Sequence, residues 1–264
     1  MKLYSWNVNG IRAVWGKGLF QDFIAQHDPD VLCLQETKAM QGQSPVDLPQ
    51  YKEYWHSAQK KGYSGTAIFT KIEPTEVRLG FSDNVQKQFD FVDSFGDPTE
   101  EGRVISAKIN GYWVVTVYTP NSKDKLERLD LRQKVWDPAF LAHVNELSAD
   151  APVVFCGDFN VAHQPIDLAR PAENVKKHGF TAQEREGFDA MIAAGFIDTF
   201  RTLHPSQKDA YTWWTNWGGA RQRNVGWRID YWMAGKSLAP KITDAQIHAG
   251  VMGSDHCPVS IDLA

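Results

Sequence analysis

The stretch "VVFCGDFN", residues 153–160, changes abruptly from apolar to polar. Its first four residues are β-branched, aromatic or cysteine side chains, and Gly157 ends the run. Such a run predicts a short buried strand. Asp158 and Asn160 follow directly, and the loop after a rigid strand is where functional side chains are commonly presented. The stretch therefore predicts a sheet with a polar site at the end of one of its strands.

The same arrangement recurs along the whole chain. Strand-length apolar runs lie at residues 3–8, 31–34, 66–69, 104–109, 112–118, 153–156, 229–233 and 259–263. Helical periodicity is found at residues 17–27, 125–147 and 182–194. No repeat or low-complexity linker divides these segments. We therefore expect one layered α/β domain over residues 1–264, with sheets covered by helices.

The composition excludes several classes of protein. Hydrophobic residues make up 42% and charged residues 23% of the 264 residues, as in ordinary soluble proteins. The opening "MKLYSWNVNG" lacks the apolar core of a signal peptide. No window approaches the roughly 18 apolar residues of a membrane span. Cys33, Cys156 and Cys257 lie far apart in or beside apolar runs, which is typical of reduced thiols. We expect a cytoplasmic protein without membrane contact.

The charge is unevenly distributed. Residues 83–101 hold one lysine and six acidic residues, so the negative charge of this segment alone is larger than the formal net charge of −4 of the whole chain. We expect this segment to be a surface insertion, although Phe89, Phe91 and Phe95 indicate that part of it docks on the protein. Elsewhere basic residues cluster: Lys60 and Lys61, then Arg170 with Lys176 and Lys177, then Arg221, Arg223 and Arg228. Local basic patches favour an anionic partner.

Polar side chains that could bind a ligand or take part in catalysis follow most of the predicted strands. They are Asn7, Asn9, Gln35, Glu36, Tyr118, Asn121, Asp158, Asn160, Asp230, Asp255 and His256. Each alone has an ordinary explanation as a turn former, a surface ion pair or a structural histidine. Together they supply oxygen ligands, a carboxylate for a histidine, amides and a phenol. Those are the groups that metal-assisted hydrolysis of a phosphate ester requires.

Individual roles follow from the residue types. Mg²⁺ prefers one or two carboxylates, which Glu36 and Asp255 offer beside Asn7. Asp158 is the candidate base for the attacking water, and a second carboxylate, Asp230, is the candidate partner that orients His256. No His/Cys spacing for zinc, nucleophilic-serine motif or P-loop is present, so no nucleotide cofactor is expected.

A set of motifs in a fixed order carries a resemblance to a known family. The motifs are "SWNVNGIRA", "LCLQETK", "KKGYSG", "EGRVI", "VYTPNS", "CGDFNVAHQPIDL", "GFTAQERE", "YTWWT", "RNVGWRIDYW" and "MGSDHCPV". Together they resemble the exonuclease III / AP endonuclease family, within the superfamily that includes DNase I and the inositol polyphosphate phosphatases. The resemblance implies a four-layer α-β-β-α sandwich with two packed mixed β-sheets.

The resemblance also implies an activity. It is Mg²⁺-dependent hydrolysis of phosphodiesters, with Mn²⁺ as a substitute, by a monomer that repairs double-stranded DNA in the nucleoid. The enzyme would cut at abasic sites, and trim or unblock 3′ ends as a 3′-5′ exonuclease and 3′-phosphodiesterase. Two alternatives remain, namely a DNA-binding module with a decayed site and a phosphatase acting on a small anionic lipid or inositol.

Residue roles carry over by position. Glu36 and Asn7 resemble the metal site and Asp255 a further metal or water ligand. Tyr118, Asp158, Asn160, Asp230 and His256 resemble the catalytic residues, and Asp158, Asn160 and His256 would hold a second metal in a two-metal mechanism. Arg12, Tyr63, Asn121, Asn174 and Arg221 resemble contacts to the DNA backbone. Trp213, Trp217, Trp227 and Ile229 resemble the wall of a pocket for an extrahelical abasic sugar.

One departure from the family pattern bears on substrate preference. In "ENVKKHGFT", residues 173–181, Lys177 stands where the family often has a second Asn, and His178 where it has a small residue. We expect Lys176 and Lys177 to meet phosphates. A ring at position 178 would narrow the pocket, which leads to the hypothesis that 3′-end processing is favoured over abasic incision. The alternative is that His178 points to solvent or contacts a phosphate.

Overall fold

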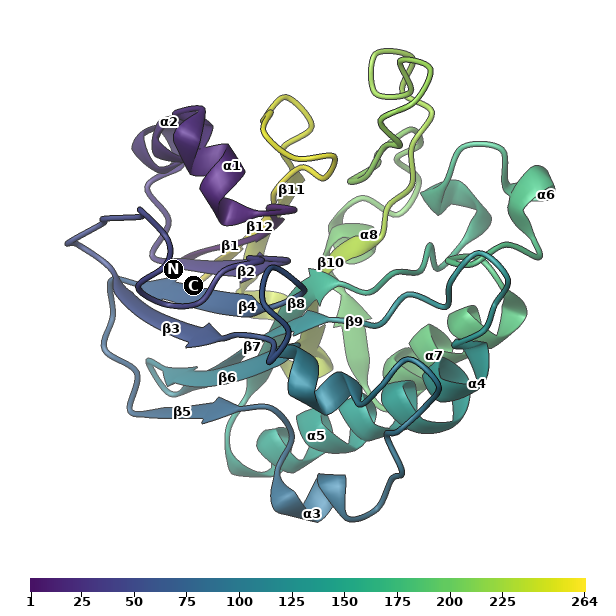
Figure 1. Ribbon diagram of the computed structural model, residues 1–264, viewed down its shortest axis with the longest axis horizontal. Coiled ribbons are helices and arrows are strands. Elements are labelled where there is room, and N and C mark those ends of the chain that lie inside the picture. The colour runs from purple at the N-terminus through teal and green to yellow at the C-terminus, as the bar shows by residue number, and fades with distance from the viewer.

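The computed structural model describes residues 1–264, which form two six-stranded sheets packed face to face (Figure 1). The first sheet has the strand order β11-β12-β1-β2-β4-β3, and the second β5-β6-β7-β8-β10-β9. Both are mixed, because β1 pairs with β2 and β7 with β8 in parallel, whereas the other pairs are antiparallel. The strands are β1 (Lys2–Asn7), β2 (Val31–Gln35), β3 (Lys52–His56), β4 (Thr66–Thr70), β5 (Glu76–Leu79), β6 (Val104–Ile109), β7 (Tyr112–Tyr118), β8 (Val153–Asp158), β9 (Phe196–Asp198), β10 (Asp230–Gly235), β11 (Ile242–Ile247) and β12 (Val259–Leu263).

The core between the sheets arises from the period-two alternation of the strands. In β8, Val154 and Cys156 face the interior, whereas Phe155 packs on the opposite face of the sheet. In β2, Val31 and Cys33 face the same interior from the first sheet. Residues of both sheets therefore form one buried cluster, which supports the expectation that residues 1–264 fold as one domain.

Helices cover the two outer faces. Phe20 and Phe23 of α2 pack with Trp6 of the first sheet, and Phe140 of α5 and Phe188 of α7 belong to the core behind the second. The fold is thus a four-layer α-β-β-α sandwich, as the resemblance implied (Figure 1). None of the helices has the length and apolar character needed to cross a membrane. The helices are α1 (Ile11–Gly16), α2 (Leu19–His27), α3 (Asp83–Gln86), α4 (Leu129–Leu131), α5 (Asp137–Asp150), α6 (Pro171–Asn174), α7 (Ala182–Ala193) and α8 (Thr199–Leu203), with 3₁₀ turns at Pro98–Glu101, Pro165–Asp167 and Lys236–Lys241.

Every strand expected from the sequence is present, with ends within two residues of the expected ones. The predictions missed β3, β5, β9 and β11, which are short or polar. The periodic segment 182–194 forms α7, and segment 17–27 contains α2. The periodic segment 125–147 is helical from Leu129 onward, because α4 continues through a π-helical turn, Arg132–Trp136, into α5 without a break. Within that turn Arg132 and Trp136 are both buried.

Residues 83–101 combine exposed and buried side chains. Val85 and Phe91 are buried in the core behind the second sheet, and Phe89 packs against it. Phe95 is 47% exposed. The side chain of Asp93 accepts two hydrogen bonds from Arg128, at 2.7 and 3.3 Å. The segment therefore contributes to the core as well as to the surface.

Glycine at position 157 lets β8 lie close to β7. Its φ is +141°, and a Cβ there would lie 1.8 Å from the carbonyl oxygen of Val117. A side chain at this position would force the two strands apart. Gly157 therefore keeps the following residue, Asp158, beside Tyr118, its partner in the parallel ladder.

Candidate active site

The predicted site residues meet because several strands end at one edge of the sandwich. Asn7 ends β1 and is in register with Gln35 at the end of β2. Tyr118 ends β7 and is in register with Asp158 at the end of β8. Asp230 begins β10, which is antiparallel, and is also in register with Asp158. Segments distant in the sequence are thus brought to one place by sheet topology.

A cavity of about 440 Å³ opens at this edge. Carboxylates, amides, a phenol and an imidazole line one part of it, and the side chains of Trp213, Trp227 and Ile229 line another. This mixture of an apolar wall and convergent polar groups is typical of a ligand site. The lining residues are Glu36, Tyr118, Asn121, Asp158, Asn160, Ala169, Arg170, Glu173, Asn174, Lys177, His178, Gly179, Trp213, Thr215, Val225, Trp227, Ile229, Asp255 and His256.

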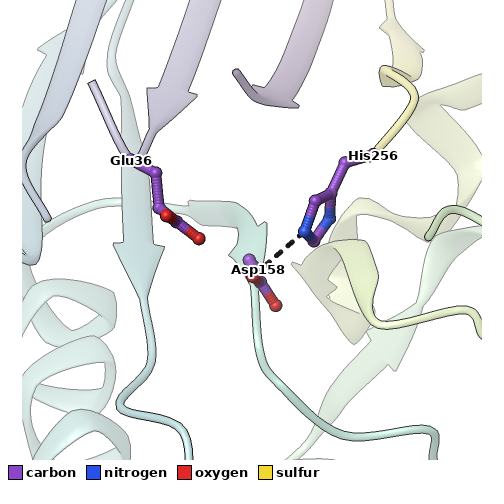
Figure 2. Close-up of side chains that lie close together, drawn as sticks. All are labelled: Glu36, Asp158 and His256. Carbon is purple, nitrogen blue, oxygen red and sulfur yellow. Dashed lines mark ion pairs between the residues drawn. The ribbon is translucent and has the colours of Figure 1, made fainter. Parts of the chain in front are cut away.

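Glu36, Asp158 and His256 form the centre of the site (Figure 2). One ligand atom from each residue lies within 4.8 Å of the others. The Nε2 atom of His256 is 3.8 Å from Oδ2 of Asp158. Asp158 and His256 are almost fully buried, at 2% and 4% exposure.

The Asn7 amide joins the two carboxylates of this centre. Its nitrogen donates to Oε1 of Glu36 at 3.1 Å and to Oδ2 of Asp158 at 2.9 Å. Its oxygen accepts from the backbone N–H of Asn9 at 3.0 Å. In this arrangement Asn7 acts as a donor to the carboxylates, whereas the sequence predicted an oxygen ligand for the metal.

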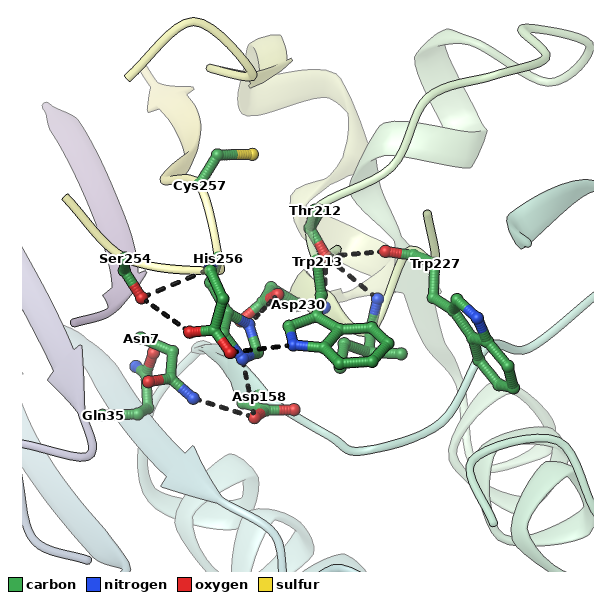
Figure 3. A network of polar contacts seen from close by, with 12 residues as sticks. Asn7, Gln35, Asp158, Thr212, Trp213, Trp227, Asp230, Ser254, His256 and Cys257 are labelled. Carbon is green, nitrogen blue, oxygen red and sulfur yellow. Dashed lines mark hydrogen bonds and ion pairs between the residues drawn. The ribbon is translucent and has the colours of Figure 1, made fainter. Parts of the chain in front are cut away.

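His256 is oriented by Asp230, as expected (Figure 3). The Nδ1 atom of His256 lies 2.9 Å from Oδ2 of Asp230, which directs Nε2 toward Asp158. The Thr212 hydroxyl accepts from the backbone N–H groups of Ile229 and Asp230, at 3.0 and 3.1 Å. These bonds fix the start of β10 and with it the orientation of the imidazole.

The buried charges shift one another's pKa. Burial raises the pKa of Asp158 to about 7, and Asp230 and Glu36 add to this, although His256 opposes it. Burial alone would lower the pKa of His256, but the negative charges of Asp230, Asp158 and Asp255 raise it to about 10. Such separated pKa values are characteristic of acid–base pairs in active sites. Near neutral pH the histidine is therefore protonated, and the carboxylate can accept a proton.

Glu36 differs from Asp158 because it has a cationic partner. The Nζ atom of Lys38 lies 2.9 Å from Oε2 of Glu36 and also bonds to Asn9. Although burial opposes it, Lys38 and Asn7 hold the pKa of Glu36 below its usual range. The sequence analysis missed Lys38 as a site residue, although its position two residues after Glu36 was an available signal.

Tyr118 and Asn160 complete the polar side of the cavity. Burial, with the nearby charge of Glu36, raises the pKa of Tyr118 well above its usual value, so its hydroxyl is a donor. The Asn160 amide nitrogen donates to the carbonyl of Thr119 at 2.8 Å, and its oxygen accepts from Asn121 at 3.3 Å. Asn160 also donates its backbone N–H to Oδ1 of Asp158 at 2.8 Å. These bonds tie the loops after β7 and β8 together.

Asp255 lines the cavity but lies outside the central cluster. Its oxygens accept from Asn9 at 2.9 Å, from Trp213 at 3.1 Å and from Ser254 at 3.2 Å. Burial would raise its pKa, but His256, Asn9 and Trp213 hold the pKa below the usual range. Asp255 thus anchors Trp213, a contact that the sequence did not predict.

The predicted DNA contacts divide into two groups. Asn121, Asn174, Lys177, His178, Trp213, Trp227 and Ile229 line the cavity. Arg12, Tyr63, Lys176, Trp217 and Arg221 do not. Trp217 is 83% exposed and lies outside the residues that line the cavity.

Arg221 also departs from its predicted role. Its terminal nitrogens donate to the backbone carbonyls of Ser254, Ala249 and Val251, at 2.8, 2.9 and 2.6 Å. Its guanidinium also stacks 4.6 Å from the ring of Trp214. Arg221 therefore fixes the loop before His256 through its terminal nitrogens, whereas its Nε has no partner.

The central cluster fits a hard divalent cation. Glu36 and Asp158 offer carboxylate oxygens within a span suited to a shared ion, whereas the protonated His256 beside them has no free ring nitrogen for a metal. Carboxylates of this kind are the protein ligands that Mg²⁺ and Mn²⁺ prefer. Of the two cations within the site, Lys38 pairs with Glu36 and His256 with Asp230, so the carboxylates outnumber the cations.

Comparisons with known proteins agree with this site. Residues 4–256 match the Endonuclease/Exonuclease/phosphatase family. The chain is 48% identical to an exodeoxyribonuclease of Bacillus subtilis, over 99% of this chain and 98% of that one. It is 46% identical to the DNA repair nuclease APEX1 of Danio rerio, over 100% and 82% of the two chains. The crystal structure of an AP endonuclease from Leishmania major superposes with a TM-score of 0.86 at 29% identity, over 99% and 87%.

A family match of this extent, with relatives of nearly equal length, defines the class of the protein. The chain belongs to the Endonuclease/Exonuclease/phosphatase family. Within that family it groups with nucleases that act on DNA, and the site is that of a phosphodiester hydrolase.

Proposed function

We propose that the protein is a Mg²⁺-dependent DNA repair nuclease that hydrolyses phosphodiesters at abasic sites and at DNA 3′ ends. The observation that carries the proposal is the meeting of Glu36, Asp158 and His256 in a cavity whose other wall is formed by Trp213 and Trp227. The polar cluster suits an anionic phosphodiester, and the apolar wall suits a sugar without its base. The names of the relatives support DNA as the substrate.

Asp158 is the proposed general base. Its raised pKa, about 7, suits proton abstraction near neutral pH, because catalysis is most effective when the pKa lies near the working pH. The water oxygen forms the new bond to phosphorus, and the bond from phosphorus to the leaving oxygen breaks. One water proton passes to Asp158. The leaving oxygen takes up a proton, and Tyr118 and His256 are the two protonated groups available in the cavity.

Charge on the phosphoryl oxygens is offset by groups already in position. The imidazolium of His256, the Tyr118 hydroxyl and the Asn160 amide line the cavity and need little reorganisation. Asp230 acts through His256, which it holds at 2.9 Å. The carboxylates of Glu36 and Asp158 would hold the divalent cation, which when bound would polarise the phosphoryl group as a Lewis acid.

The DNA would lie across the rim of the cavity. Asn174 lines it from the end of α6 and Lys177 from the segment that follows, and Lys176 is exposed beside them. The basic residues of this segment thus lie where a polyanion would approach, although the chain as a whole is acidic. The arrangement suits a monomer, because one chain supplies every group named above.

His178 supports a preference for 3′ ends over internal abasic sites. It lines the cavity, and its Nδ1 lies 3.6 Å from Oδ1 of Asp124. A ring there occupies space that a flipped-out sugar needs, and base flipping already costs a few kcal/mol. A frayed 3′ terminus needs less extrusion. The variant His178→Gly should therefore raise abasic incision relative to 3′ trimming on the same duplex, and an unchanged ratio would mean that the ring does not gate the pocket.

The test of the activity uses three labelled duplexes, carrying an internal abasic site, a blocked 3′ end or a normal 3′ end. With Mg²⁺ the protein should cleave at least one of them, and with EDTA none. DNA binding without cleavage in Mg²⁺ or Mn²⁺ would instead indicate a DNA-binding module with a decayed site. Release of phosphate from an inositol phosphate, with intact DNA, would indicate a phosphatase.

A further inference from the structure

A buried arginine packs directly behind the candidate catalytic tyrosine. Arg103 precedes β6, is 3% exposed, and contacts Tyr118 in three ways. Its guanidinium carbon lies 4.5 Å from the centre of the Tyr118 ring. Its Nη1 donates to the carbonyl of Tyr118 at 2.8 Å, and its own carbonyl accepts from the Tyr118 N–H at 2.8 Å. Arg103 does not line the cavity, so any effect it has on the reaction must pass through another residue.

Arg103 is itself fixed by a chain of buried ion pairs. Its Nε donates to Oε2 of Glu101 at 2.6 Å. The other oxygen of Glu101 lies 3.8 Å from Nη1 of Arg128, which makes a two-point contact with Asp93. Arg103 and Arg128 are buried and the side chains of Glu101 and Asp93 are only partly exposed, so the four residues form a charge-balanced network. Planar guanidinium groups suit such a network because their donors are pre-oriented.

The backbone beside this network is equally constrained. Gly102 has a φ of +64°, and a Cβ there would lie 2.3 Å from the carbonyl of His56. The carbonyl of Gly102 accepts from the Thr66 hydroxyl at 3.0 Å, and that of Glu101 accepts from the Gly65 N–H at 3.2 Å. The two residues that precede Arg103 are thus held against the first sheet, which leaves the backbone before the guanidinium little freedom.

From this geometry we propose that Arg103 is a positioning residue for Tyr118, and that Glu101, at the end of the acidic segment 83–101, fixes Arg103. The proposal rests on the proposed function, because it gives Tyr118 a part in hydrolysis. The stacked guanidinium holds the ring in one orientation, and its bond to the Tyr118 carbonyl holds the end of β7. Small displacements of a reacting or orienting group reduce rates strongly. The acidic segment therefore acts in catalysis from behind the site.

The test compares Arg103→Met, which removes all donors, with Arg128→Met, a matched control. Arg128 is as buried and belongs to the same network, but it does not touch the Tyr118 ring. Arg103→Met should lower the single-turnover cleavage rate by about tenfold or more, with the affinity for uncleaved duplex unchanged. Arg128→Met should lower the rate by less than about threefold, even if both variants lose similar thermal stability.

A double-mutant cycle with Tyr118→Phe separates positioning from general damage. If Arg103 acts through Tyr118, Arg103→Met should slow a Y118F enzyme much less than it slows the wild type. Should Arg103→Met fail to fold, Arg103→Lys replaces it, because lysine keeps the charge but loses the planar stacking. Equal rate losses in the two backgrounds, or no loss with either variant, would overturn the role of Arg103. A wild type that cleaves none of the three duplexes would overturn the proposed function, and this proposal with it.

Discussion

Two groups of buried charges lie near the start of β10, and they differ in balance. The carboxylate–histidine cluster contains Glu36, Asp158, Asp230 and Asp255, with His256 and Lys38 as its cations. The arginine–aspartate cluster contains Asp167, Asp198, Arg201 and Arg228, two charges of each sign. The carboxylate–histidine cluster has an excess of negative charge and is called the unbalanced cluster. The arginine–aspartate cluster has no excess of either charge and is called the balanced cluster.

The balanced cluster is fully paired. Arg228 donates to Asp167 at 2.8 Å and to Asp198 at 2.6 Å, and Arg201 donates to Asp167 at 2.6 Å. Although burial opposes it, Arg228 and Arg201 hold the pKa of Asp167 below its usual range. Within the unbalanced cluster, in contrast, the pKa of Asp158 is raised. The difference teaches that the arginine–aspartate cluster is complete without a ligand, whereas the carboxylate–histidine cluster is suited to receive a cation.

The largest effect is expected when the unbalanced cluster loses its base. Asp158→Asn should lower the cleavage rate by about 10²–10⁴-fold, because the variant cannot accept the proton of the attacking water. Its thermal stability should not fall, since a buried carboxylate among like charges is removed. Single-turnover kinetics and calorimetry on the same preparation check both expectations. Cleavage at the parent rate would show that another group activates the water.

The corresponding change in the balanced cluster should affect stability instead. Asp167→Asn leaves Arg228 and Arg201 without a full counter-charge, and breaking a buried pair typically costs about 3–5 kcal/mol. Urea unfolding should show this loss, whereas the folded variant should retain most of its cleavage rate at low temperature. An equal loss of stability in Asp158→Asn would remove the distinction between the two clusters.

A buried histidine that forms no ion pair gives the third prediction. His143 lies 2.9 Å from the Ser106 hydroxyl, and burial lowers its pKa to about 4. The pKa of His143 in the folded protein is below the unfolded value of about 6.5. The contribution of His143 to the free energy of unfolding is therefore fully present above pH 6.5 and is lost as the pH falls toward 4. The expected loss is about 3 kcal/mol. His143→Gln should flatten this part of the stability profile, and an unchanged slope would assign acid sensitivity to other groups.

The smallest expected effect concerns the rim of the site. Lys177 lines the cavity and Lys176 does not, although both are exposed. If Lys177 contacts a phosphate, Lys177→Gln should reduce the slope of log affinity against log salt by about 0.9, the value for one phosphate contact on duplex DNA. Lys176→Gln is the matched control and should change the slope less. Equal slopes for the two variants would place both lysines outside direct contact.

Much of the fold could be predicted because buried strands have a local signature. Segments 104–109, 112–118 and 259–263 were predicted with the observed bounds, since their apolar runs are ended by turn residues. Strands β3 and β5 were missed because each lies at a sheet edge with exposed positions and no apolar run. Edge strands are defined by their neighbours, and a local pattern does not contain that information.

The candidate site was predictable in its composition but not in all its contacts. The pairing of Asp230 with His256 follows from motif and chemistry, and the structure contains it. The internal bonds of Arg221 and the exposure of Trp217 depend on how the loop between them folds, which their residue types do not determine. The role proposed for Arg103 was also not predicted from the sequence, because the stacking of this residue, which precedes β6, on Tyr118 at the end of β7 is visible only in three dimensions.

The most direct test of the central claim is the Mg²⁺ dependence of abasic-duplex cleavage by protein first dialysed against EDTA. The account predicts no cleavage without metal, recovery with Mg²⁺ or Mn²⁺, and a requirement for at least about tenfold more Mg²⁺ in Glu36→Gln, with little change in DNA affinity. Full activity in the continued presence of chelator would contradict it, because the unbalanced cluster would then carry out hydrolysis without the cation that its excess negative charge is proposed to hold.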